Sequence, residues 1–162
     1  MAVGVTVGGM VAVRRAGVGD AAVVGGLLYD FNVEFETETP SAGEFATRFA
    51  GMLARQDVVV LLAEDETGPA VGFAYLTTRP TPYWDGALAQ LEELYVRPAL
   101  RDRGIGGALL AEALALPGVA EMHINVDEVD VDTRRFYERH GFVNIQPGTD
   151  YRMLCYLREF GG

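Results

Sequence analysis

A basic, glycine-rich turn near the middle of the chain has the residue types needed to bind phosphate. Segment 91–110 reads LEELYVRPALRDRGIGGALL, so a strand-like run leads through the turn into an apolar run typical of a helix. The turn carries two arginines and three glycines: Arg101, Arg103, Gly104, Gly106 and Gly107. Glycines let an anion approach the backbone N–H groups at a helix start, where the helix dipole is positive. The pattern predicts a pyrophosphate site, although a glycine-rich helix start with solvated arginines would have the same spacing.

Two common nucleotide-binding loops fit this turn poorly. A Rossmann fingerprint needs its first glycine directly after the strand, whereas seven residues separate Val96 from Gly104. Its sixth position should also be small, and here that position is Leu109. A Walker A loop needs a lysine, and all thirteen basic residues of this chain are arginine. The Rossmann loop is therefore disfavoured and the Walker A loop excluded.

Two other places in the sequence have groups that could transfer protons. Glu92 and Glu93 adjoin each other in the predicted strand, and neighbours in a strand point to opposite faces unless a bulge intervenes. Only one carboxylate is then expected to face a reacting group. Tyr137 lies beside Phe136 in a predicted helix, and its hydroxyl could act as an acid. From composition alone, packing is the simpler explanation of this aromatic pair.

Acidic and aromatic residues gather in two predicted loops. Glu34, Glu36 and Glu38 lie where the first two predicted helices join, and Tyr83 and Trp84 lie in a later loop. Carboxylates and aromatic faces attract ammonium groups, so these residues are candidates for binding an amine substrate. Ordinary surface charge is an equally good explanation in an acidic chain.

Hydrophobic periodicity and turn residues predict a mixed α/β chain. The predicted helices cover 18–36, 41–53, 104–116 and 132–140. The predicted strands cover 10–14, 58–64, 70–78, 88–96, 119–126, 142–145 and 152–157. The second helix begins with a capping box formed by Ser41 and Glu44. This order predicts a central mixed, mainly antiparallel sheet of about six to seven strands with helices on both faces.

Composition limits the class of protein. The 162 residues, 49% of them hydrophobic, suit one domain over 10–162 after a flexible tail over 1–9. A net charge of −10 argues against nucleic-acid binding, and no apolar run approaches the roughly 20 residues that span a membrane. Cys155, the single cysteine, lies in an apolar alternating stretch that predicts a buried thiol in a reducing cytoplasm. His123 and His140 lack the spacing of metal ligands, so no metal is expected.

Three stretches of this sequence resemble signatures of the GNAT superfamily of N-acetyltransferases. Residues 101–106, RDRGIG, match the family pattern of Arg or Gln, two residues, Gly, one residue, then Gly or Ala. The preceding LYVRP, 94–98, is the usual approach to that turn, and FYERHGF, 136–142, resembles the second family signature. As an order of elements, the resemblance covers about 10–160.

The resemblance implies the GNAT fold with acetyl-CoA held between two strands. The cofactor's pantetheine arm would pair with the main chain of Leu94, Tyr95 and Val96. Its pyrophosphate would lie on Arg101, Asp102, Arg103, Gly104, Ile105, Gly106 and Gly107. Family members often carry Asn where this chain has Asp130, so an ionised Asp130 would accept a hydrogen bond from the cofactor but not donate one.

The resemblance also implies a reaction. Tyr137 occupies the family's general-acid position and would protonate the departing thiolate. LEELYV, 91–96, resembles spermidine/spermine acetyltransferases, in which the first of two adjacent acids is thought to act as a base through water, so Glu92 is preferred to Glu93. The expected function is transfer of an acetyl group from acetyl-CoA to a primary amine of a small molecule or peptide, by direct attack in a ternary complex. A non-catalytic acyl-CoA sensor is the alternative, and family habit allows a homodimer.

Overall fold

The computed structural model describes residues 6–7, 11–66 and 68–160. The chain forms two compact units, Met1–His123 and Ile124–Gly162. The tail predicted for 1–9 lies outside the described residues, except for Thr6–Val7, which form a short strand. The single domain predicted for 10–162 stays a prediction.

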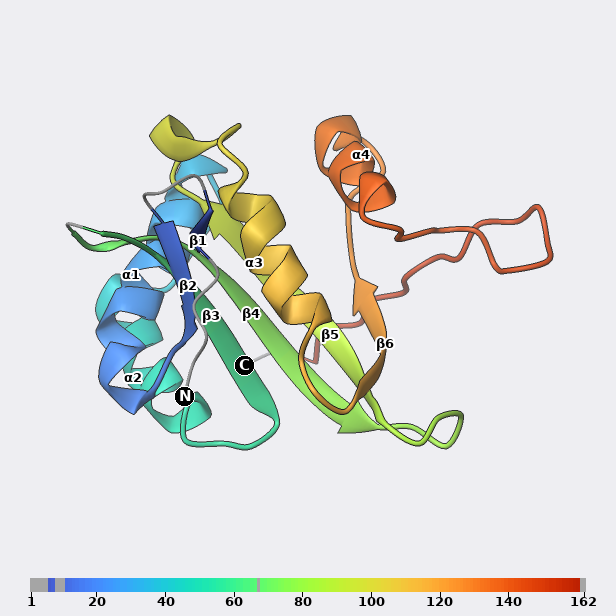
Figure 1. Ribbon diagram of the computed structural model, residues 1–162, viewed down its shortest axis with the longest axis horizontal. Coiled ribbons are helices and arrows are strands. Elements are labelled where there is room, and N and C mark those ends of the chain that lie inside the picture. Colours follow the sequence, from blue (N-terminus) through green and yellow to red (C-terminus); the bar gives the residue numbers. More distant parts are fainter. Residues whose placement is uncertain (1–5, 8–10, 67, 161–162) are drawn as a thin grey trace. The chain divides into compact units, whose positions relative to one another are not determined.

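A six-stranded sheet, within the described residues, follows the order of the chain (Figure 1). Its strands are β1 Thr6–Val7, β2 Val11–Arg15, β3 Val58–Asp65, β4 Ala70–Pro80, β5 Ala87–Val96 and β6 Val119–Ile124. Each neighbouring pair from β1 to β5 is antiparallel. The expectation of a mainly antiparallel sheet of this size is therefore confirmed.

Helices cover both faces of the sheet in the first unit, as predicted. They are α1 Ala21–Glu34, α2 Ala42–Met52 and α3 Ile105–Leu114, with short 3-10 turns at Val18–Asp20 and Pro98–Leu100. Helices α1 and α2 share a core with Val60, Leu62 and Phe73. Helix α3 packs against β3, β4 and β5 and lies roughly along the strand direction (Figure 1). Alternate residues of β3 are therefore buried on both faces, which explains its continuous apolar sequence.

Helix α1 packs closely on α2. A side-chain carbon at Gly25 would lie 2.6 Å from the backbone nitrogen of Ala46, so only glycine fits at this crossing. At the start of α2, Ser41 Oγ accepts a hydrogen bond from the backbone N–H of Glu44, and the Glu44 carboxylate accepts one from the backbone N–H of Ser41. The predicted capping box is confirmed, and it sets where the connection between the two helices ends.

The second unit contains α4, Val131–Arg139, followed by an irregular segment. The strands predicted for 142–145 and 152–157 are wrong, because only an isolated bridge between Ile145 and Arg152 forms there. A turn brings the two segments together, but alternating apolar residues make a strand only when a neighbour completes the ladder. Cys155 is exposed in this segment, so the prediction of a buried thiol is also wrong.

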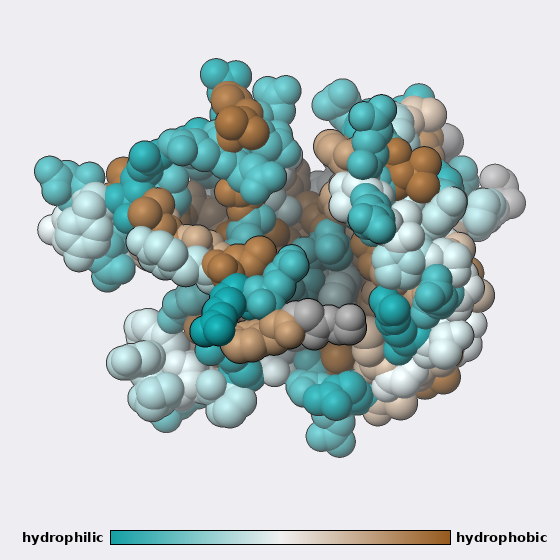
Figure 2. All heavy atoms as spheres, turned by 180° about the vertical axis from the view of Figure 1, so that it is seen from behind, coloured by the Kyte–Doolittle hydropathy of each residue, from teal (hydrophilic) through white to brown (hydrophobic). Residues whose placement is uncertain are grey.

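One face of the surface is mostly polar. Seen from behind, it is largely hydrophilic, with separate hydrophobic patches between the polar areas (Figure 2). None of the helices in the described part of the chain is long and apolar enough to cross a membrane.

Candidate active site

The glycine-rich turn has the backbone geometry of an anion site. Asp102 and Gly104 both have positive φ, 61° and 80°, and such a φ is unusual for a residue with a side chain. Gly104 is the N-cap of α3 and, because it has no side chain, it makes no capping hydrogen bond to the helix. The first turn of α3 contains no acidic residue. The N–H groups at this helix start therefore have neither intrahelical partners nor a side-chain cap, which leaves them available to a phosphate.

Arg101 lies in this turn, but its side chain makes hydrogen bonds to residues outside the turn. Its Nε donates to the carbonyl oxygen of Val96 at 2.9 Å. Its two terminal nitrogens donate to the two carboxylate oxygens of Glu34 at 2.6 and 2.7 Å. The guanidinium also lies over the ring of Tyr95, 5.7 Å from its centroid. Arg103 is exposed in the same turn.

A β-bulge in β5 brings Glu92 and Glu93 to the same face of the sheet. Tyr75 of β4 pairs with Glu93, but the next residue, Leu76, pairs with Leu91, so Glu92 is the extra residue. Thr77 Oγ1 donates to the Glu92 carboxylate at 2.6 Å. Tyr75 and Thr77 are two apart in a strand and share a face. The expectation that the two acids point to opposite faces is therefore wrong at this bulge.

The environments of the two carboxylates differ. Burial, and then the negative charge of Glu92, raise the pKa of Glu93 to about 7. Glu92 is exposed and accepts the hydrogen bond from Thr77, whereas Glu93 is half-buried. Burial and the charges of both glutamates also raise the pKa of the neighbouring Tyr75. A carboxyl group with a pKa near neutrality is suited to accept and release a proton, and Glu93 rather than Glu92 has this property. The preference for Glu92 drawn from sequence stays a prediction.

The other residues of β5 expected to meet the cofactor have mixed environments. Leu94 is half-buried and pairs with Ala74, and the Val96 carbonyl accepts from Arg101. Tyr95 is buried, with its ring 5.2 Å from that of Phe31. The side chain of Tyr95 is thus part of the core, and only its main chain is left for a ligand.

The aromatic loop before β5 contacts β6. Trp84 Nε1 donates to one carboxylate oxygen of Glu121 at 2.6 Å, and the other oxygen lies 2.5 Å from His123 Nε2. The hydrogen bonds from Trp84 and His123 lower the pKa of Glu121. Tyr83 is 82% exposed and lies beside this cluster in sequence. Sequence reasoning missed Glu121, although its i, i+2 spacing from His123 on a strand places the two on one face.

The three acidic residues at the end of α1 and just after it have different surroundings. Glu34, its last residue, is paired with Arg101. Glu36 is exposed and has a positive φ of 52°, in the turn after the helix. Glu38 is also exposed.

In the second unit, Tyr137 is a buried member of an aromatic group. Its ring makes edge contacts with Phe136 and Phe142, with centroids 5.1 and 5.5 Å apart. Asp130 is the N-cap of α4, and its carboxylate accepts from the backbone N–H of Thr133 at 3.1 Å. His140 bonds through Nδ1 to the carbonyl oxygen of Phe136. Asp130 therefore has a structural role within this unit, and its cofactor contact stays a prediction.

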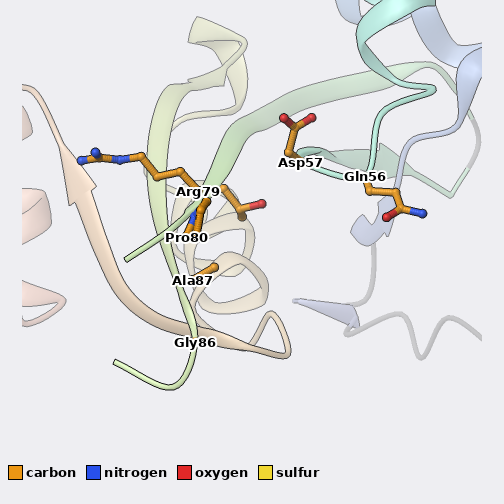
Figure 3. Close-up of a pocket in the computed structure, with 7 residues that line it drawn as sticks. Gln56, Asp57, Arg79, Pro80, Gly86 and Ala87 are labelled. Atoms are coloured by element: carbon orange, nitrogen blue, oxygen red, sulfur yellow. The ribbon is translucent and has the colours of Figure 1, made fainter. Parts of the chain in front are cut away.

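A shallow pocket of about 420 Å³ lies at the other end of β4 and β5 from the glycine-rich turn (Figure 3). It is lined by Gln56, Asp57, Arg79, Pro80, Gly86 and Ala87, among others. The Arg79 side chain points away from Asp57 (Figure 3). Because β5 is ten residues long, this pocket lies roughly 30 Å from the turn and is a separate feature.

Among the described residues, no group of three or more His, Cys, Asp or Glu could hold a metal ion.

Comparison with known proteins identifies the family. The acetyltransferase (GNAT) domain matches residues 56–144, more than half of the chain. The chain therefore belongs to the GNAT acetyltransferase family, and the resemblance seen in its sequence motifs is confirmed. A crystal structure from Arthrobacter sp. FB24, described as an acetyltransferase, is 47% identical; the match covers 91% of this chain and 94% of that one, with a TM-score of 0.84.

Two further proteins similar to this chain have more specific names. An aminoglycoside N(6′)-acetyltransferase type 1 from Klebsiella aerogenes is 40% identical over 72 residues, which are 43% of this chain and 47% of that protein. The match thus spans about half the length of this curated relative. The aminoglycoside N-acetyltransferase AAC(6′)-Iy, solved in complex with CoA, is 18% identical, with a TM-score of 0.68 and coverage of 93% and 100%. At that identity the likeness extends to the fold alone.

Proposed function

We propose that the chain transfers an acetyl group from acetyl-CoA to a primary amine of a cationic small molecule, with Glu93 as the general base. The observation that carries the proposal is the bulge in β5, which places two carboxylates on one face. Burial, and then the charge of Glu92, raise the pKa of Glu93 to about 7. The same strand leads, through the short 3-10 turn at Pro98–Leu100, into the glycine-rich turn with its uncapped helix start. Strand β5 thus carries a proton acceptor, and the turn after it offers a candidate phosphate site. Both are needed to transfer an acetyl group from a thioester that bears phosphates.

The proposed reaction begins with an ammonium group beside the two acids. The Glu93 carboxylate removes one proton, and the neutral amine attacks the thioester carbonyl carbon. The nitrogen of the tetrahedral intermediate gives its second proton to water, and the intermediate collapses with loss of the coenzyme A thiolate. Tyr137 protonates this thiolate, in the role that the family resemblance gives it, and Tyr137 and Glu93 return to their starting forms by exchanging protons with water. Glu92 acts through its charge, because a second carboxylate favours binding of the cation and raises the proton affinity of Glu93. N–H groups of the glycine-rich turn hold the pyrophosphate.

An aminoglycoside is the acceptor class best supported. The net charge of −10 favours a cationic substrate, and aminoglycosides carry several ammonium groups. The relative from Klebsiella aerogenes is named for this class of substrate. We assign Trp84 and Tyr83 to binding of the acceptor, because both are exposed aromatic residues that can bind a cation and Trp84 is hydrogen-bonded to the Glu121 carboxylate. Glu34 and Glu36 add negative charge after α1.

A non-catalytic acyl-CoA sensor is the second candidate. It is favoured by Asp130, which stands where family members often carry Asn and which caps α4 in this structure. A sensor would bind the cofactor through the turn but would have no use for a carboxyl group of pKa about 7 at the bulge.

Incubation with acetyl-CoA and kanamycin A, which carries a 6′-amine, separates the two candidates. The proposed enzyme releases coenzyme A thiol and adds the mass of one acetyl group to kanamycin A. Raising the ionic strength should increase the apparent KM for kanamycin A more than that for a neutral amine of similar size, because screening weakens long-range attraction. A sensor would bind acetyl-CoA calorimetrically yet release no thiol with any member of an amine panel, and that result would refute the proposed activity.

A further inference from the structure

Arg101 and Glu34 join two parts of the candidate site that are far apart in sequence. Arg101 belongs to the glycine-rich turn and Glu34 is the last residue of α1, 67 positions earlier. The two side chains form a bidentate ion pair, in which both carboxylate oxygens accept hydrogen bonds, at 2.6 and 2.7 Å. Their side chains are 38% and 26% exposed, so the pair is partly shielded from water. Pairs of this geometry are stronger and more directional than single contacts between exposed charges.

The position of Glu34 on its helix makes it dependent on a cation. A carboxylate in the last turn of a helix lies next to the negative end of the helix dipole and is destabilised there. The last turn of α1 contains no basic residue. Arg101 therefore supplies the compensating charge from outside the helix.

The same contacts use the donors with which Arg101 would bind a phosphate. Of the five N–H donors of a guanidinium group, one points to Val96 and two point to Glu34. The edge of the guanidinium that matches a carboxylate is also the edge that matches two phosphate oxygens. Glu34 and a pyrophosphate thus compete for one surface of Arg101.

We infer that Glu34 is a resting-state counterion that holds Arg101 away from the cofactor, and that the cofactor's phosphates displace it when they bind. The inference rests on the proposed function, since it takes coenzyme A as the ligand of the turn. This inference predicts the opposite effect from the one expected if Glu34 merely oriented Arg101 toward the phosphate. If Glu34 only positioned Arg101 for the phosphate, its removal would weaken cofactor binding; if Glu34 competes, its removal strengthens cofactor binding.

Calorimetric titration with coenzyme A shows whether removal of the Glu34 charge raises or lowers the Kd. Coenzyme A lacks the acetyl group, so no turnover occurs during the titration. Glu34→Gln keeps the size of the side chain and removes its charge. We expect it to lower the Kd for coenzyme A by roughly two- to fivefold, the range of a well-formed ion pair near the surface. The gain should shrink at high salt, because screening weakens both the ion pair and the phosphate contact.

The chain offers a matched control one turn earlier on α1. Asp30 forms an ion pair with Arg97 at 2.9 Å, which also links α1 to the segment leading into the turn, and both side chains are about two-fifths exposed. Asp30→Asn removes the same charge from the same helix without freeing Arg101, so the Kd for coenzyme A should stay close to that of the parent. In an Arg101→Ala background, Glu34→Gln should have no effect on that Kd, because the competition is gone.

The outcomes separate this inference from the proposed function. A Kd that rises or stays unchanged in Glu34→Gln, while the parent binds coenzyme A, overturns the competition and leaves the cofactor assignment intact. Equal tightening in Asp30→Asn would assign the gain to general charge and also overturn it. A parent protein that does not bind coenzyme A at all overturns both the inference and the proposed function.

Discussion

Replacing Glu93 with glutamine should lower kcat/KM for the amine acceptor by about 10²- to 10⁴-fold, the range that a positioned general base contributes. Glutamine keeps the shape of the side chain but cannot accept the proton. Steady-state rates with acetyl-CoA and kanamycin A, together with thermal melts, measure the effect. Because burial raises the pKa of Glu93 above its ordinary value, the ionised form is disfavoured in the folded protein. Above pH 7 the Glu93→Gln protein should therefore be at least as stable as the parent.

The neighbouring acid is the matched control. Glu92→Gln removes an exposed carboxylate one residue away and should cost far less activity than Glu93→Gln. The reverse order, with Glu92→Gln the more damaging and Glu93→Gln within about twofold of the parent, well short of a general-base effect, would restore the preference drawn from sequence. The bulge would then not determine which of the two carboxylates acts as the base.

Gly106→Glu should abolish the stabilisation of the protein by acetyl-CoA. A ligand at 100 times its Kd stabilises the folded state by about 2.7 kcal/mol, which raises Tm by roughly 5–10 °C in a chain of this length. Gly106 is the second residue of α3, where a pyrophosphate should meet free N–H groups, and glutamate places bulk and negative charge there. Thermal melts with and without acetyl-CoA measure the shift.

Gly43→Glu is the control for that change. Gly43 is the second residue of α2, exposed and with open space around the position of an added side chain. The variant therefore adds the same charge at the same place in a different helix and should keep the full shift. If folded Gly106→Glu protein keeps the shift as well, the glycine-rich turn is not the phosphate site.

The parts of the fold set by local sequence were predictable. The hairpin of β3 and β4, the capping box at Ser41 and Glu44, and the helix that starts after Gly104 each depend on residues close in the chain. The glycine-rich turn was recognisable for the same reason, since its arginines and glycines lie within seven consecutive residues, 101–107; that it binds phosphate stays a proposal. These elements required no knowledge of distant neighbours.

The features missed from sequence depend on partners elsewhere in the chain. The bulge at Glu92 arises from the register between β4 and β5, which no residue of LEELYV encodes alone. The pairing of Glu34 with Arg101 bridges 67 positions, so each residue was assigned to a different ligand. The segment after Phe142 alternates like a strand, yet its only pairing is the bridge from Ile145 to Arg152 within the part of the chain that the structure describes.

The most direct test of the central claim is the pH dependence of kcat/KM in the parent and in Glu92→Gln, measured with one acceptor so that ionisation of the amine is common to both. Glu93 must be ionised to act as a base, so the parent rate should rise with pH through an apparent pKa of about 7. Glu92→Gln removes a like charge that disfavours ionisation of Glu93, so the rise should move to lower pH, while burial keeps it above the ordinary range for glutamate. In Glu93→Gln the rise should be absent. A profile that is the same in the parent, Glu92→Gln and Glu93→Gln would contradict the assignment of Glu93 as the base.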